Sequence, residues 1–192
     1  MAALRDLPDL AATLSGALAQ RGIKHVISGA VAMAAHGYVR ATVDLDVLVV
    51  VPALRLPETF AVVRDLGFAG EDAEMLSSLR DRGVATFRAG AVGIEILVPV
   101  LPYHRTLVGR SVETSVGGRS VPVVSIEDLV ILKLLWRRLK DIPDIHALLQ
   151  LAGKRFDSLY AERTLSSILP EEDPRHAELR LLVERFARSA GG

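Results

Sequence analysis

Two aspartates separated by a single residue are the most informative chemical feature of this sequence. Asp44 and Asp46 lie in residues 43–51, where all remaining positions are Val or Leu, and a run of this kind predicts a strand. Side chains alternate across a strand, so the two carboxylates share one face. The opposite face, which begins with Val43, is apolar throughout and is expected to be buried.

A third acid, Glu95, lies in a second predicted strand with the same arrangement. In residues 91–98 the even-numbered positions are all Val or Ile, and Glu95 lies on the other face. Carboxylates within a strand are costly to desolvate, and two acids at this spacing repel each other. A divalent cation relieves both costs, and Mg²⁺ typically takes one or two carboxylates together with water and substrate phosphates. The alternative is that Asp-x-Asp lies at a frayed strand end in water.

The residues upstream of the acidic strand form a candidate phosphate site. Residues 27–46 read as a strand, a glycine turn, a helix of small residues, a loop and then the acids. The turn contains Ser28, Gly29 and Ala30, and a glycine turn that leads into a helix presents backbone N–H groups suited to a phosphate. Arg40 precedes Asp44 by four residues, so its guanidinium could bind a phosphate or neutralise the carboxylates.

The segment from His36 to Asp46 reads His-Gly-x-x-Arg-x-Thr-x-Asp-hydrophobic-Asp. This string resembles the nucleotidyltransferase superfamily, which has a polymerase-beta-like fold. The similarity is to its small prokaryotic branch of minimal nucleotidyltransferases, abortive-infection-type toxins and aminoglycoside nucleotidyltransferases. It extends through residues 125–149, where Glu-Asp-Leu, Lys-Leu-Leu and Lys-Asp-x-x-Asp-Ile resemble the helical segment that follows the core.

The resemblance implies a role for each candidate residue. Asp44 and Asp46 would ligate Mg²⁺, with Mn²⁺ as an alternative, and Glu95 would be the third catalytic acid, either a further metal ligand or a base. The turn at Ser28, Gly29 and Ala30 would hold the triphosphate of an NTP substrate. Ala30 is a departure, because the family has Gly or a small polar residue there; alanine keeps the N–H group but lacks glycine's freedom or a hydroxyl.

Lys133 is a further candidate for nucleotide binding. It is the single charge in residues 129–136, a stretch that is otherwise apolar and is therefore expected to be largely buried. Its ammonium could reach the acids or a phosphate, or its stem could pack while the ammonium extends to water. Nearby Lys140, Asp141 and Asp144 are expected to form caps and local ion pairs.

The predicted elements give an α/β (α+β) fold: a mixed β-sheet nucleotidyltransferase core flanked by helices in residues 1–124, with a helical C-terminal region, residues 125–192, packed on the core. The last third begins with Ser125, which is followed three residues later by Asp128 and is expected to cap a helix. Helices are expected at residues 4–20, 29–36, 56–66, 72–80, 129–139, 142–151, 156–169 and 174–188. Strands are expected at residues 25–27, 43–51, 84–88, 91–98, 111–116 and 119–124.

Composition excludes several other classes of protein. The 192 residues carry 23 Lys plus Arg against 23 Asp plus Glu, and zero net charge argues against broad electrostatic binding of nucleic acid. No cysteine is present, so disulfides, a thiolate nucleophile and cysteine-based zinc sites are excluded. Apolar runs are far shorter than the roughly 20 residues of a membrane helix, and Asp6 and Asp9 are unlike a signal peptide. A cytoplasmic protein is expected.

The expected function is Mg²⁺-dependent transfer of a nucleoside monophosphate from NTP to a hydroxyl acceptor, with release of pyrophosphate. The acceptor could be a protein, a small molecule or a tRNA end, with tRNA ranked lowest because of the zero net charge. A homodimer or a cognate partner protein is possible. The alternative is a catalytically degenerate interaction module with the same fold, such as the partner protein of a toxin–antitoxin pair. Ala30 favours that alternative, whereas retention of three costly acids opposes it.

Overall fold

The computed structural model describes residues 6–189, which divide into two compact units. The sheet unit contains residues up to 35 together with residues 39–124, and the helical unit contains residues 36–38 together with those from 125 onward. Each unit has its own buried core, and each is described separately below.

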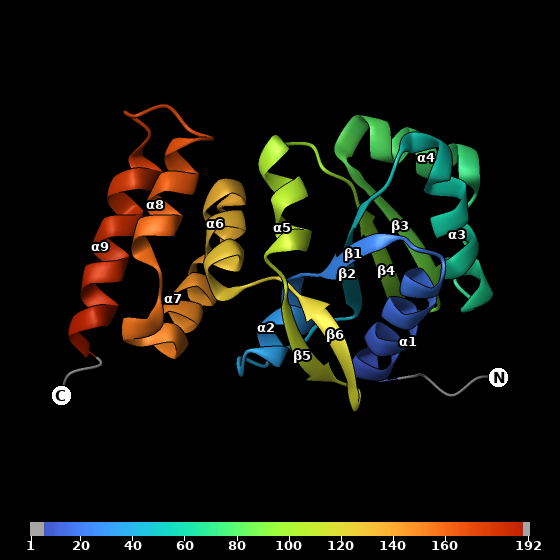
Figure 1. Ribbon diagram of the computed structural model, residues 1–192, viewed down its shortest axis with the longest axis horizontal. Coiled ribbons are helices and arrows are strands. Elements are labelled where there is room, and N and C mark those ends of the chain that lie inside the picture. Colours follow the sequence, from blue (N-terminus) through green and yellow to red (C-terminus); the bar gives the residue numbers. More distant parts are fainter. Residues whose placement is uncertain (1–5, 190–192) are drawn as a thin grey trace. The chain divides into compact units, whose positions relative to one another are not determined.

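The sheet unit is built on a mixed six-stranded sheet in the order β3-β4-β2-β1-β6-β5 (Figure 1). Antiparallel pairs β1/β2, β3/β4 and β5/β6 are joined by two parallel pairs, β2/β4 and β1/β6. This confirms the predicted α/β fold with a mixed sheet. The elements are α1 (Leu7–Gln20), β1 (Lys24–Ile27), α2 (Gly29–Ala35), β2 (Asp44–Val50), α3 (Leu56–Asp65), α4 (Asp72–Arg82), β3 (Val84–Ala89), β4 (Val92–Leu97), α5 (Thr106–Gly109), β5 (Val112–Val116) and β6 (Arg119–Val123), with short 3-10 turns at Ala53–Arg55 and Pro102–Arg105.

One face of the central strands forms the core of the sheet unit. Leu45 of β2 and Ile94 of β4 are paired in register, and both are fully buried. Phe87 of β3 continues this row, and its ring centroid lies 5.3 Å from that of Phe60 in α3. The acids of β2 and β4 alternate with these side chains and therefore lie on the opposite face.

Several predicted elements begin or end at other residues in the structure, and the two at the start of β2 and of α1 concern the site and the described range. Val43 is 53% exposed rather than buried, because β2 begins one residue later and the side chain of Val43 lies at the edge of the paired sheet. The first helix begins at Leu7, and the expected Leu4 lies outside the described residues.

The helical unit consists of α6 (Ile126–Trp136), α7 (Asp141–Ala152), α8 (Ser158–Ser166) and α9 (Pro174–Ser189), with a 3-10 turn at Gly153–Arg155. The expected cap of α6 is present, since the Ser125 hydroxyl accepts a hydrogen bond of 3.2 Å from the Asp128 N–H group. The helix ends at Trp136 instead of Leu139, because Arg137 has a left-handed conformation with φ 45°. Its N–H group donates to the Lys133 carbonyl, which closes the last turn.

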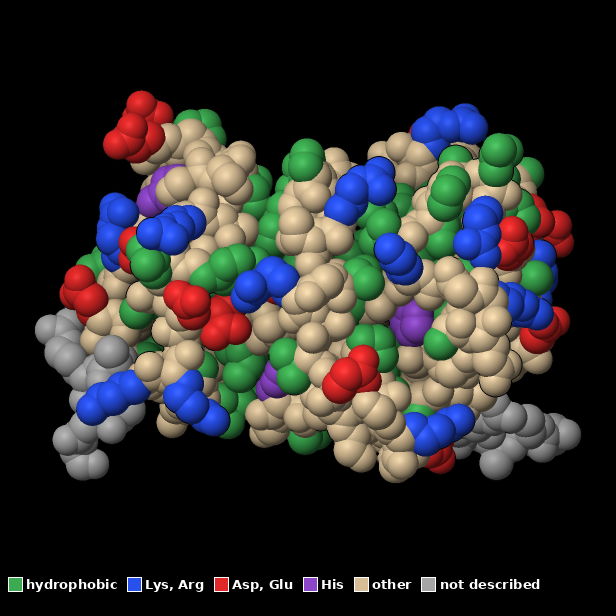
Figure 2. All heavy atoms as spheres, in the orientation of Figure 1, with side chains coloured by type: hydrophobic (Ala, Val, Ile, Leu, Met, Phe, Trp, Pro, Cys, Tyr) green, Lys and Arg blue, Asp and Glu red, His purple; other side chains and the backbone are tan. Residues whose placement is uncertain are grey.

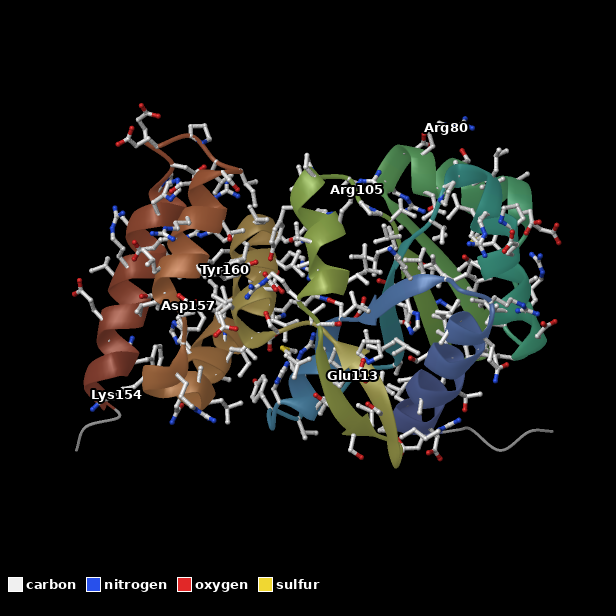
Figure 3. All side chains as sticks on the ribbon, viewed as in Figure 1. Arg80, Arg105, Glu113, Lys154, Asp157 and Tyr160 are labelled. Atoms are coloured by element: carbon white, nitrogen blue, oxygen red, sulfur yellow. The ribbon has the colours of Figure 1, made fainter. Side chains whose placement is uncertain are left out.

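A tyrosine joins α8 to α6 within the helical unit. Asp157 caps α8 by accepting a hydrogen bond from the N–H group of Tyr160 (Figure 3). The Tyr160 hydroxyl donates to Asp128 Oδ1 of α6 at 2.6 Å. Asp128 is fully buried, and hydrogen bonds from the hydroxyl groups of Tyr160 and Ser125 compensate the desolvation of its carboxylate.

Within residues 6–189, no helix combines the length and the apolar composition needed to cross a bilayer. Acidic and basic side chains are interspersed on the visible face of each unit (Figure 2).

Candidate active site on strands β2 and β4

The three acids expected from the sequence lie on one face of two adjacent strands. Asp44 of β2 is paired in register with Gly93 of β4, and Asp46 is paired with Glu95. Residues paired in this way point to the same side of a sheet. All three acidic residues are partly exposed, and the Asp44 side chain retains 30% of its accessible surface. The acids are therefore held by buried strands and still reach solvent.

Gly29 lies directly against Asp46. A Cβ atom at position 29 would lie only 1.8 Å from Asp46 Oδ2, and Gly29 has φ +60°, where L side chains are disfavoured. The Ser28 N–H group donates to the Asp46 carbonyl at 2.9 Å and so continues the pairing of β1 with β2. Glycine is therefore required for the turn into α2 to approach the Asp46 carboxylate.

Asp44 makes an ion pair with Arg88 of β3. The distance from Arg88 Nη1 to Asp44 Oδ1 is 2.6 Å. Arg88 is not among the residues that the sequence pattern predicts for the site. A two-residue turn at residues 90–91 indicates that Arg88 pairs with Gly93, but the parallel register that places Gly93 beside Asp44 has no signal in the sequence.

Thr42 fixes the backbone where β2 begins. Its hydroxyl accepts a hydrogen bond from the Asp44 N–H group at 3.3 Å and donates one to the Asp44 carbonyl oxygen at 3.1 Å. Local bonds of this kind are typical of threonine at the ends of regular elements. Thr42 is the threonine of the motif that precedes the two aspartates, so this part of the motif orients the first acid.

The remaining candidates of the sheet unit lie before β2. Ala30 is 2% exposed, so its methyl group belongs to the core and only its backbone can face a ligand. Ser28 and Arg40 are partly exposed, and Arg40 lies in the segment between α2 and β2. Of these candidates, the turn before α2 lies beside an acid, because Gly29 approaches the Asp46 carboxylate.

Lys133 is bound within the helical unit. Its Nζ atom lies 2.7 Å from Asp144 Oδ2 and 3.4 Å from Asp141 Oδ1, and its side chain is 8% exposed. Arg138 Nε lies 2.8 Å from Asp141 Oδ2. The expected local ion pairs of the two aspartates are therefore present. The ammonium does not extend to water, because it is enclosed with these carboxylates.

The described part of the chain contains no group of three or more His, Cys, Asp or Glu side chains placed to hold a metal ion. The ligands expected from the sequence, Asp44 and Asp46, lie two residues apart on β2, and Arg88 is paired with Asp44.

Comparison with known proteins identifies the class of fold to which this mixed sheet with acids on its central strands belongs. Residues 7–181 match the family described as "Nucleotidyl transferase of unknown function (DUF2204)", and the chain belongs to this family. The resemblance seen in the sequence is thus confirmed, as is the class of enzyme. Comparison with the curated proteins finds no match.

Solved structures share the fold at low sequence identity. The crystal structure of ANT(2'')-Ia in complex with adenylyl-2''-tobramycin is 18% identical with a TM-score of 0.55, and the match covers 96% of this chain and 98% of that one. An antigenic nucleotidyltransferase-like protein from Paracoccidioides brasiliensis is 16% identical with a TM-score of 0.55, with coverage of 93% and 92%. At these identities the similarity shows the fold.

Proposed function

We propose that this protein transfers a nucleoside monophosphate from NTP to a hydroxyl group in a reaction that requires Mg²⁺ and releases pyrophosphate. The observation that carries the proposal is the placement of Asp44, Asp46 and Glu95 on one face of β2 and β4. Two glycines, Gly29 and Gly93, lie directly against these carboxylates, where any side chain would collide with Asp46 or with Asp44.

The acid pair has the donor set of a magnesium site. Asp44 and Asp46 offer carboxylate oxygens, and Mg²⁺ is commonly held by one or two carboxylates while water and substrate phosphates complete its shell. Mn²⁺ accepts the same ligands. When bound, the ion would neutralise phosphate charge and lower the pKa of the acceptor hydroxyl. Glu95, paired with Asp46 across the strands, serves either as a further ligand or as the base that accepts the hydroxyl proton.

The chain's own residues bind and orient the nucleotide in this proposal. The Ser28 N–H group is bonded to the Asp46 carbonyl and so holds the turn at Gly29 against the Asp46 carboxylate, and the proposal assigns the triphosphate to this turn and the start of α2. Ala30 contributes its backbone only, and Arg40 contributes a cation for a phosphate. Lys133 is omitted from the proposed site, because Asp141 and Asp144 already neutralise its charge.

The transfer step forms one bond and breaks one. The acceptor oxygen attacks the α-phosphorus, the bond from that phosphorus to the bridging oxygen breaks, and pyrophosphate leaves while the hydroxyl proton passes to a base. A small molecule or a protein side chain is the proposed acceptor. The net charge of zero is unfavourable for tRNA, and a fold neighbour, ANT(2'')-Ia, was crystallised with an adenylylated small molecule.

Label transfer tests the proposal directly. Purified protein is incubated with Mg²⁺, a cell lysate and each α-³²P-labelled NTP in turn, and labelled products are separated by size. We expect label on one acceptor, and loss of more than about 100-fold in the Asp44→Asn/Asp46→Asn double variant, since even residues that merely support a metal ligand contribute up to this much. Equal labelling by the double variant would refute the assignment. Absence of label with all four NTPs would favour the degenerate interaction module.

A further inference from the structure

The contact between Arg88 and Asp44 crosses an entire strand. Arg88 belongs to β3 and Asp44 to β2, and β4 lies between them in the sheet. Neighbouring strands are about 4.8 Å apart, so the contact spans roughly twice that distance along the sheet. Nevertheless, Arg88 Nη1 lies 2.6 Å from Asp44 Oδ1. Among the charged side chains, arginine has the length and the terminal fork needed for such a contact.

A glycine in the intervening strand provides the path. Arg88, Gly93 and Asp44 form one row across the sheet, since Arg88 is paired with Gly93 and Gly93 with Asp44. A Cβ atom at Gly93 would lie 2.3 Å from Asp44 Oδ1 and 2.7 Å from Arg88 Nη1. Any other residue in this row would therefore separate the guanidinium from the carboxylate.

The cation compensates a local excess of negative charge. Asp44 and Asp46 lie two residues apart on one face, and Glu95 lies beside Asp46 in the next strand. Like charges at this spacing repel one another. Arg88 supplies a positive charge at Asp44, and its side chain remains 50% exposed. An ion pair this exposed is weak enough to be exchanged for another cation.

We propose that Arg88 is a positioning residue that holds Asp44 in the metal-free protein and competes with the divalent cation for it. The inference rests on the metal-binding role proposed above for the acid pair. Arg88 takes the place of external positive charge until the ion is present, and binding of the ion requires Asp44 Oδ1 to leave the guanidinium. The affinity for metal therefore depends on the row formed by Arg88, Gly93 and Asp44 as well as on the acids.

Direct metal binding tests this competition without any measurement of activity. Free Mn²⁺ is titrated into metal-free protein and followed by its electron paramagnetic resonance signal. Because Arg88→Gln removes the competing pair, we expect this variant to bind Mn²⁺ about two- to fivefold more tightly than the wild type. Arg88→Lys, which keeps the charge on a shorter side chain, is expected to lie between the two.

A matched control separates the Asp44 contact from a general effect of charge. Arg64 forms an ion pair with Asp72 at the surface, and the two side chains are 38% and 45% exposed. Arg64→Gln removes the same charge from an equally exposed pair and is expected to leave Mn²⁺ affinity unchanged. Thermal unfolding is a second measurement. The Tm should rise more between EDTA and saturating Mn²⁺ for Arg88→Gln than for the wild type.

The outcomes distinguish this inference from the proposed function. If the wild type binds Mn²⁺ and Arg88→Gln binds it with the same or a weaker affinity, the proposed competition is wrong, and the metal site itself remains supported. If Arg64→Gln raises the Mn²⁺ affinity as much as Arg88→Gln does, the proposed competition at Asp44 is also wrong. Absence of Mn²⁺ binding in both the wild type and Arg88→Gln overturns the metal-binding role itself, and the inference with it.

Discussion

Two pairs of aspartates in this protein have opposite surroundings. In the sheet unit, Asp44 and Asp46 lie two residues apart on β2, and the Asp44 side chain is 30% exposed. In the helical unit, Asp141 and Asp144 lie three residues apart on α7, and their side chains are 0% and 2% exposed. The same residue type at similar spacing is therefore placed once at a solvent-accessible face and once in a core.

The difference lies in where the compensating charge comes from. Asp141 and Asp144 share Lys133, and Asp141 also accepts hydrogen bonds from Arg138, so the chain itself neutralises this pair. Buried carboxylates need such complete pairing because desolvation is expensive. The pair on β2 has one half-exposed arginine, and its remaining oxygens can receive ligands from outside. A saturated pair stabilises the fold, whereas an accessible pair is available for binding and chemistry.

The largest expected effect comes from breaking the saturated pair. Lys133→Met leaves two carboxylates buried without their shared cation, and we expect the free energy of unfolding to fall by about 3–5 kcal/mol. Urea denaturation followed by circular dichroism measures this change. Lys140→Met is the matched control, because Lys140 is exposed and its loss should change stability by less than about 0.5 kcal/mol. If Lys133→Met and Lys140→Met lowered the free energy of unfolding equally, the buried ion pairs of Lys133 would not be what stabilises this region.

Acidification should weaken the same pair. Burial alone would raise the pKa of Asp141, but hydrogen bonds from Arg138 and the nearby charges of Lys133 and Arg138 outweigh it and hold this pKa below its ordinary value of 3.8. Because the pKa is lower in the folded state, the contribution of Asp141 to stability is present above pH 3.8 and is lost as the pH falls through the folded-state value.

Comparison of the wild type with Asp141→Asn at a series of pH values isolates this contribution. We expect the stability advantage of the wild type to be constant from about pH 7 to 5 and to shrink below the ordinary carboxyl pKa. Thermal melts at each pH give the difference between the two proteins. An advantage that grows on acidification would show that Asp141 is not stabilised as a carboxylate.

The smallest expected effect on stability belongs to the accessible pair. Asp44→Asn removes one exposed ion pair and also relieves repulsion from Asp46, so the free energy of unfolding should change by less than about 1 kcal/mol. Urea denaturation of metal-free protein measures it, with Arg64→Gln as a control for the loss of another exposed pair. A loss as large as that of Lys133→Met would mean that Asp44 is a structural residue.

Much of the candidate site followed from local patterns. Alternation in residues 43–51 and 91–98 placed Asp44, Asp46 and Glu95 away from the apolar face, because a strand has a period of two whatever its neighbours. The motif before the acids predicted the family, which the family match over residues 7–181 confirms. The roles of these acids as ligands or bases stay predictions until metal and transfer are measured.

Ends of elements were less predictable. The helix after Ser125 was expected to continue to Leu139, since residues 129–136 are almost all apolar and give no signal to stop. It ends at Trp136 because Arg137 has a left-handed conformation, which a sequence rarely announces for a residue other than glycine. Leu139, three residues beyond this end, is 90% exposed.

The sequence by itself determined that two acids share one face of a strand and that Lys133 lies in a largely buried stretch, because both follow from short-range periodicity. Only the tertiary structure decided which partners these groups have. Lys133 meets Asp144 through the packing of α6 against α7. Arg88 meets Asp44 through hairpin register on one side of β4 and parallel pairing on the other. Register between strands depends on contacts between distant parts of the chain, so the pairing row that neutralises Asp44 becomes visible only when the sheet is assembled.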